Sequence, residues 1–260
     1  MCETRRLSIV LAALILCLAA SLLANLWLIR WARHYARLAY STRLDPIGRE
    51  RYPSGQETAA ELGAGPADLP RVVLFGDSRA QQWPAPEANG AWVVINRGID
   101  GQSTLQALER FDAHIDGLEP AVVVVQLGVN DLVALALMPG DRERIVAACK
   151  EHLRQVVSRA RAQGATVVVT TIIPPGRPPP AARLFWSEAI PAAIAEVNAY
   201  LVGLAGDGVL VLDTAAVLAG ADGRVRPAYQ ADHLHLNRAG YEALNAALIP
   251  VVRGALRAQQ

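Results

Sequence analysis

Lysine, aromatic residues and net charge are all scarce in this chain of 260 residues. Lys150 is the only lysine among 25 basic residues, and 24 acidic residues reduce the formal net charge to +1. A chain this close to neutrality is not a nucleic-acid-binding protein that relies on bulk positive charge. Aromatic residues make up only 5% of the chain, whereas hydrophobic residues make up 52%. That hydrophobic fraction can fill a core, which excludes disorder of the whole chain.

Cysteine is rare as well. The chain has three cysteines, Cys2, Cys17 and Cys149, and no C-x-x-C motif. This odd number of widely spaced cysteines excludes a disulfide framework and predicts unpaired thiols. A lipoprotein-type role for Cys17 is the alternative, but Leu16 precedes it where such a site has a small residue.

Residues 7–29 contain no charged side chain. As a helix at about 1.5 Å per residue they extend roughly 35 Å, enough to cross a hydrocarbon core of about 30 Å. Trp27, Trp31 and Tyr35 lie at the C-terminal end of this run, where a membrane interface favours amphipathic rings. We therefore predict an N-terminal tail over residues 1–6 and an uncleaved transmembrane anchor over residues 7–29.

A cleaved signal peptide is the main alternative, because Ala19-Ala20-Ser21 has the small residues of a cleavage site. The apolar run continues to Ile29, which is long for the hydrophobic region of a signal peptide. A buried helix of a soluble protein is a third alternative. Arginines flank the run on both sides and leave its orientation open. The working prediction places the domain that follows outside the cytoplasm, in the periplasm, although charge counting alone could favour the cytoplasm.

Residues 30–69 are expected to form a juxtamembrane linker, since glycines and prolines interrupt any periodic pattern from residue 43 onward. One short helix is expected in it near residues 56–62. Residues 70–260 form one domain in which apolar runs alternate with helical patterns. Strands are expected at residues 72–75, 92–95, 121–127, 166–172 and 209–212, and helices at residues 104–118, 141–163, 187–204 and 237–257. This alternation predicts an α/β fold with a parallel sheet covered on both faces.

Polar motifs with glycines follow three of these strands, and a fourth polar motif precedes the last helix. They are Gly76-Asp77-Ser78, the stretch 96–101, Gly128-Val129-Asn130-Asp131 and Asp232-His233-Leu234-His235. Ligands of such sheets bind beyond the carboxyl ends of the strands, so these motifs are expected to meet at one site.

Their side chains suit nucleophilic acyl transfer. Ser78 is the candidate nucleophile, His235 can remove its proton, and Asp232 can orient the imidazole. Gly101 and Ser78 can each offer a backbone N–H, and Asn130 an amide N–H, to a developing oxyanion.

The four motifs resemble, in order and spacing, the conserved blocks of the SGNH (GDSL-type) hydrolase superfamily. The segment 94–99 is similar to members near the lysophospholipase and platelet-activating-factor acetylhydrolase branch. The resemblance implies a flavodoxin-like three-layer α/β/α sandwich with about five parallel strands. It also implies Ser78, Asp232 and His235 as the catalytic triad, with Ser78, Gly101 and Asn130 as oxyanion donors. It implies no metal and no cofactor.

The chain departs from this family at Arg79-Ala80, where many relatives have leucine and a small residue. Arg79 is a candidate contact for an anionic or carbohydrate group of the substrate, and a structural ion pair is its alternative. Gly98 is expected to serve turn geometry, and Asp77 and Asp131 to brace loops or cap helices. The proline-rich stretch 174–180, with Trp186 nearby, could shape the site or act as a stiff connector.

These observations predict a membrane-tethered serine esterase. Its expected substrate is a carboxylic ester, with an acetyl or short acyl group on a lipid or carbohydrate, and the reaction passes through an acyl-enzyme. An O-acyltransferase with the same triad and a non-catalytic envelope module of the same fold are the alternatives. No nucleic-acid partner is expected, and the oligomeric state stays open.

Overall fold

The computed structural model describes residues 2–51, 69–87 and 89–259. The chain divides into two compact units, Met1–Pro46 and Ile47–Gln260. The short helix expected near residues 56–62 lies outside the described residues, as does part of the expected linker. Cys17 and Cys149 are free thiols, as predicted.

The first unit contains one long helix, α1 (Cys2–Leu44). Its stretch Ser8–Leu44 is long and apolar enough to cross a membrane, which makes it a candidate anchor or signal sequence. The helix continues well beyond residue 29, where we had expected the linker to begin. Arginine, alanine and leucine are frequent in this extension, and neither glycine nor proline interrupts it before Pro46, so the sequence favours continued helix.

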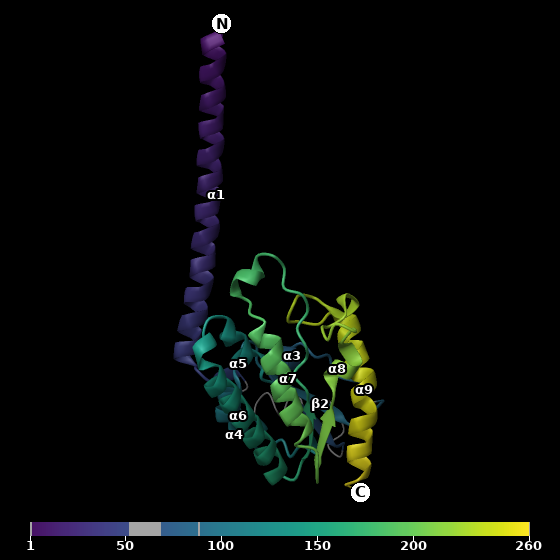
Figure 1. The fold of residues 1–260 in the computed structure, drawn as a ribbon. Helices are drawn as coiled ribbons and strands as arrows, with labels where there is room; N and C mark the ends of the chain where they lie inside the picture. The colour runs from purple at the N-terminus through teal and green to yellow at the C-terminus, as the bar shows by residue number, and fades with distance from the viewer. Residues whose placement is uncertain (1, 52–68, 88, 260) are drawn as a thin grey trace. The chain divides into compact units, whose positions relative to one another are not determined.

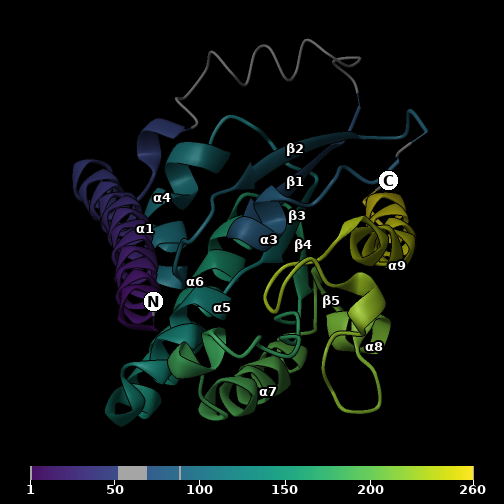
Figure 2. The same ribbon diagram turned by 90° about the horizontal axis from the view of Figure 1, so that it is seen from above.

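The second unit is built on five parallel strands (Figures 1 and 2). They are β1 (Arg71–Gly76), β2 (Val93–Gly98), β3 (Val122–Gln126), β4 (Thr166–Thr170) and β5 (Val209–Leu212). Their spatial order is β2-β1-β3-β4-β5, which is the flavodoxin-like order predicted from the resemblance. The order reverses between β1 and β3, and ligands of such sheets bind beside this reversal.

Helices cover both faces of the sheet, as Figure 2 shows. On one face, α4 (Thr104–Ile115), α6 (Arg142–Ala162) and α7 (Ala189–Val202) pack against alternate strand residues such as Val73 and Phe75. On the other face, α8 (Thr214–Leu218) and α9 (Arg238–Arg257) pack against the intervening residues, such as Val72 and Leu74. Strand residues that are apolar on both faces therefore produce the predicted three-layer sandwich.

Short elements connect the longer helices and strands along the chain. Two are one-turn helices at the carboxyl ends of strands, α3 (Ser78–Gln81) and α5 (Val129–Val133). The 3-10 turns are η1 (Arg49–Arg51), η2 (Ala134–Ala136), η3 (Pro139–Asp141), η4 (Ala182–Phe185) and η5 (Pro227–Tyr229). None of these turns is predicted from the sequence, because a single turn contains too few residues to reveal a helical period.

The expected end of the second strand was wrong. Asn96 and Gly98 belong to β2, where they pair with Leu74 and Gly76 of β1. Polar Asn96 is retained in the strand because its amide donates to Ala80 O at 2.8 Å and its Oδ1 accepts from Gly98 N at 2.8 Å. Gly98 serves close packing rather than a turn, since a Cβ there would lie 2.1 Å from Gln81 N.

Candidate active site

The candidate nucleophile lies where β1 meets α3. Asp77 is the N-cap of α3, and its Oδ1 accepts a hydrogen bond from Arg79 N at 2.9 Å. This confirms the capping role predicted for Asp77 and fixes the turn that carries Ser78. Ser78 is the first residue of the helix and is only 3% exposed. The cap thus orients a largely buried serine at the carboxyl edge of the sheet.

Asp232 and His235 are held together by their own short loop. Asp232 Oδ1 accepts from Leu234 N at 2.6 Å and from His235 N at 2.8 Å, while Oδ2 lies 2.8 Å from His235 Nδ1. Burial acts to raise the pKa of Asp232, but these hydrogen bonds from Leu234 and His235 hold it below its usual value. An ionised Asp232 can only accept, so His235 Nδ1 carries the proton of this pair.

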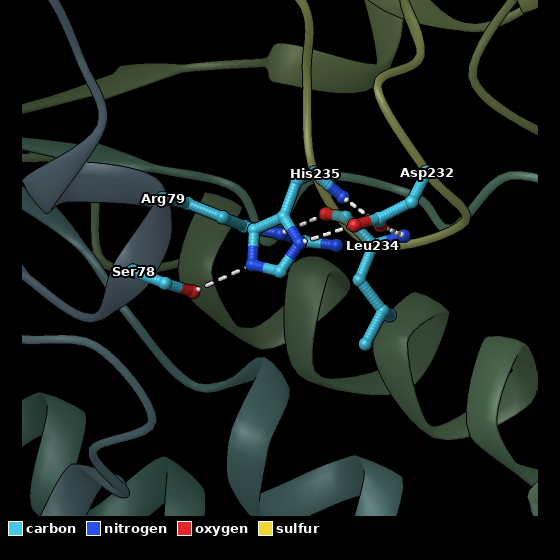
Figure 3. Close-up of polar contacts among 5 residues, drawn as sticks. All are labelled: Ser78, Arg79, Asp232, Leu234 and His235. Carbon is cyan, nitrogen blue, oxygen red and sulfur yellow. Dashed lines mark hydrogen bonds and ion pairs between the residues drawn. The ribbon is translucent and has the colours of Figure 1, made fainter. Parts of the chain in front are cut away.

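Figure 3 shows the His235 ring between Ser78 and Asp232, with His235 Nε2 3.1 Å from Ser78 Oγ. Because Nδ1 carries the proton, neutral His235 presents the Nε2 lone pair to the Ser78 hydroxyl. The fold therefore brings together three side chains that the sequence separates by as many as 157 positions. This arrangement can move the hydroxyl proton to the ring and hold the resulting imidazolium beside a carboxylate.

Two of the candidate oxyanion donors follow β2 and β3: Gly101 lies in the turn after β2, and Asn130 lies in α5 after β3. Asn130 Nδ2 donates to Gln102 O at 2.9 Å, which joins α5 to the turn that contains Gly101. Gly101 is exposed and has a φ of 72°, a conformation that glycine adopts without strain. Asp131 braces the same region, because it accepts from Thr104 N at 2.8 Å and from Thr104 Oγ1 at 2.6 Å. The bracing predicted for Asp131 is thus confirmed.

A buried arginine that the sequence analysis did not single out supports these loops. Arg110 of α4 donates through Nε to Gln102 Oε1 and through Nη2 to Gly76 O at 2.9 Å. Its guanidinium also lies over the Phe75 ring, 4.4 Å from the centroid. Arg110 therefore ties the strand end before Ser78 to the turn after β2. An exposed and a buried arginine look alike in a helical pattern, so the sequence carried no signal for it.

The expectation that Arg79 contacts substrate was wrong. Its side chain is fully buried, with Nε 2.8 Å from Leu234 O and Nη1 2.7 Å from Ile173 O. Tyr241 Oη also donates to Arg79 O at 3.0 Å. Burial lowers the pKa of Arg79, and the neighbouring Asp77 carboxylate opposes this effect. Arg79 therefore ties the turn of Ser78 to the loop of His235, behind the site (Figure 3).

Asp77 should make folding stability depend on pH. Burial raises its pKa from 3.8 to about 6, although Arg79 acts to lower it. The folded state then holds this proton more tightly than the unfolded state, so stability falls as pH rises from about 4 to about 6 and is level above. Asp77→Asn keeps an acceptor for Arg79 N but cannot ionise. Relative to this variant, the wild type should lose up to about 3 kcal/mol of unfolding free energy between pH 4 and 7.

Urea unfolding of the detergent-solubilised chain, followed by tryptophan fluorescence at each pH, measures this difference. Asp207→Asn, at an exposed position, makes the same substitution on the surface and is the matched control. A wild-type-to-Asp77→Asn difference that is constant from pH 4 to 7 would contradict the raised pKa.

Comparison with known proteins identifies the family of the chain. The sequence profile of the GDSL-like Lipase/Acylhydrolase family matches residues 60–243. The chain is 30% identical to Esterase TesA of Pseudomonas aeruginosa over 118 residues, which cover 44% of this chain and 55% of TesA. It is 29% identical to the uncharacterized lipoprotein YqeF of Bacillus subtilis over 119 residues, which cover 40% and 48%. The chain thus spans about half the length of these curated relatives.

A solved structure of similar fold is a GDSL-like lipase from Bacteroides thetaiotaomicron, with a TM-score of 0.60 and 22% identity. The similarity covers 80% of this chain and 98% of that one. Since the family profile matches more than half of the sequence, the chain belongs to the GDSL-like lipase/acylhydrolase family.

Proposed function

We propose that this protein is a serine esterase that hydrolyses carboxylic esters through an acyl-enzyme. One observation carries the proposal: His235 lies 3.1 Å from Ser78 Oγ on one side and 2.8 Å from Asp232 on the other. A serine hydroxyl is a weak nucleophile until a base takes its proton, and this pair supplies an oriented base.

The reaction has two halves. Ser78 Oγ attacks the ester carbonyl while its proton moves to His235 Nε2, and the imidazolium then gives that proton to the departing alcohol. Water repeats the sequence on the acyl-enzyme: His235 removes a proton from water, the hydroxyl attacks the acyl carbon, and Ser78 Oγ leaves with the proton. Asp232 stays ionised throughout and stabilises the charged ring.

Both tetrahedral intermediates place negative charge on the former carbonyl oxygen. The proposed donors to this oxygen are the backbone N–H groups of Ser78 and Gly101 and the Asn130 amide. One Asn130 N–H is used to bind Gln102 O, and the second is left to donate. That bond fixes the amide plane before substrate arrives, which is the preorganisation that oxyanion stabilisation requires.

The proposed substrates are acetyl or other short acyl esters of a lipid or a carbohydrate. The similarity to a protein named as an esterase supports ester hydrolysis. We further propose that α1 is an uncleaved anchor that holds the catalytic domain at the outer side of the cytoplasmic membrane. The apolar length of α1 supports the anchor, and one curated relative is named as a lipoprotein.

A fluorophosphonate probe tests the chemistry, because it bonds covalently to a serine activated by a histidine. The full chain in mild detergent should be labelled on Ser78, as identified by mass spectrometry of its peptides. Labelling should disappear in Ser78→Ala and persist in Ser158→Ala, a control at an exposed position on α6. A folded chain that stays unlabelled, or carries the label elsewhere, would refute the proposal.

The same probe can show on which side of the membrane the catalytic domain lies. A membrane-impermeant version should label intact spheroplasts, and a labelled band of full-length mass would show that the anchor is uncleaved. Labelling only after lysis would place the domain in the cytoplasm.

The balance between hydrolysis and transfer distinguishes an esterase from an O-acyltransferase. Hydrolysis should exceed acyl transfer when a sugar or glycerol is added in excess. Dominant transfer to the added hydroxyl would make the protein an O-acyltransferase.

A further inference from the structure

A cavity of about 470 Å³ lies beside the loop that carries His235. Its lining comprises Arg177, Pro178, Arg183, Trp186, Glu188 and Arg224. These residues come from the connection between β4 and α7 and from the segment before η5. In Figure 1 the green connection stands at the same end of the second unit as the yellow-green loop before α9.

The cavity adjoins the proposed catalytic loop through two contacts. Gly176 N donates to His233 O at 2.9 Å. The rings of Trp186 and His233 meet edge to face, with centroids 5.6 Å apart. Since His233 lies between Asp232 and His235, a group bound in this cavity would be close to the reacting ester.

Positive charge dominates the lining. Arg177 is 80% exposed and pairs with Asp222 at 3.5 Å, and Arg224 pairs with Glu188 at 3.5 Å. Both pairs are long and partly in solvent, so they bind these arginines weakly. Exposed Arg183 has no carboxylate within ion-pair distance in the part of the chain that the structure describes. Three arginines thus line the cavity together with one carboxylate residue, Glu188, while Asp222 is not part of the lining.

We propose that this cavity binds an anionic group, a phosphate or a carboxylate, carried by the ester substrate. This inference rests on the proposed esterase function and narrows its substrate class. Guanidinium groups bind both anions through paired hydrogen bonds, and cavities with an aromatic wall and a few convergent polar groups are typical ligand sites. The bound anion would orient the ester toward Ser78 without taking part in bond making.

Two matched substrate pairs test the proposal on the full chain in mild detergent. Acetylglycerol phosphate is compared with acetylglycerol, and acetylated glucuronic acid with acetylated glucose. In each pair kcat/KM should be at least about tenfold higher for the anionic ester, mainly through a lower KM. The phosphate pair represents a lipid headgroup, and the glucuronate pair represents a glycan. The pair with the larger ratio of anionic to neutral kcat/KM therefore identifies whether the natural substrate is a lipid or a glycan. Added salt should reduce the advantage.

Arg177→Gln/Arg183→Gln should bring the anionic and neutral esters to similar kcat/KM, while activity toward the neutral esters stays at the wild-type level. Arg253→Gln removes the same kind of charge from an exposed position of α9 outside the cavity, and it should preserve the preference. Equal kcat/KM within both pairs for the wild type would overturn the inference. So would an equal loss on anionic and neutral esters in the double variant.

A direct measurement of anion binding tests the same proposal without any turnover of substrate. Glycerol phosphate and glucuronate should bind Ser78→Ala in calorimetric titration, and binding should be lost when the two arginines are also replaced. Absence of binding to folded Ser78→Ala overturns the cavity assignment, whereas absence of fluorophosphonate labelling overturns the esterase assignment. The two failures are therefore distinguishable.

Discussion

Ser78→Ala is expected to lower kcat/KM for p-nitrophenyl acetate by at least about 10³-fold, and His235→Ala by a similar factor. His235 Nε2 lies 3.1 Å from Ser78 Oγ, so the hydroxyl proton can pass directly to the ring. Alanine at either position ends this transfer. Because the two residues act as one unit, the double variant should be no slower than the slower single variant. Initial rates in detergent, normalised to folded protein, measure all three values.

Ser158→Ala should keep wild-type activity, since Ser158 is exposed on α6. All variants should share the wild-type near-ultraviolet circular dichroism, which separates loss of chemistry from loss of fold. Wild-type turnover in Ser78→Ala would disprove the assigned nucleophile. Multiplied losses in the double variant would mean that Ser78 and His235 act independently, which the assigned proton transfer does not allow.

The sequence alone predicts the parallel sheet, and it predicts that motifs far apart in the chain lie at one site. The four consecutive valines that begin Val122–Gln126 are typical of a strand covered on both faces, and parallel strands place their carboxyl ends on one edge of the sheet. That rule predicts that the segments carrying Ser78, Gly101 and Asn130 meet, whereas His235, which precedes the last helix, is placed beside them by the resemblance to the family. The expected start of the helix at residue 104 agrees with α4, which Ser103 caps through a capping box with Gln106.

What the sequence could not reveal depends on partners that are distant along the chain. Arg79 was interpreted as a candidate substrate contact, because the carbonyl groups that bind its side chain, on Ile173 and Leu234, lie 94 and 155 positions away. Asn96 appeared to end a strand because the carbonyl that binds its amide belongs to α3. Polar residues of this kind are buried only because a particular tertiary contact satisfies them.

Arg79→Leu would install the residue that the resemblance to the family leads one to expect, yet here it is expected to impair the enzyme. Leucine cannot donate to Leu234 O or Ile173 O, and each buried carbonyl left without a donor costs about 1–3 kcal/mol. The lost contact to Leu234 also frees the loop that presents His235 to Ser78. Because a misplacement of about 1 Å can reduce catalysis about 10²-fold, kcat should fall by roughly 10- to 100-fold while KM changes little.

Fluorophosphonate titration of active sites separates positioning from simple loss of fold. A positioning role predicts that kcat per titrated site falls, that the rate of labelling of Ser78 falls with it, and that Tm is also lower. Arg79→Lys keeps a charge and can satisfy one carbonyl, but not both in the planar geometry of a guanidinium, so it should recover part of kcat. If Arg79→Leu lowers Tm and leaves kcat per titrated site unchanged, the guanidinium supports the fold alone, and the geometry of His235 must be set by the hydrogen bonds that Asp232 accepts.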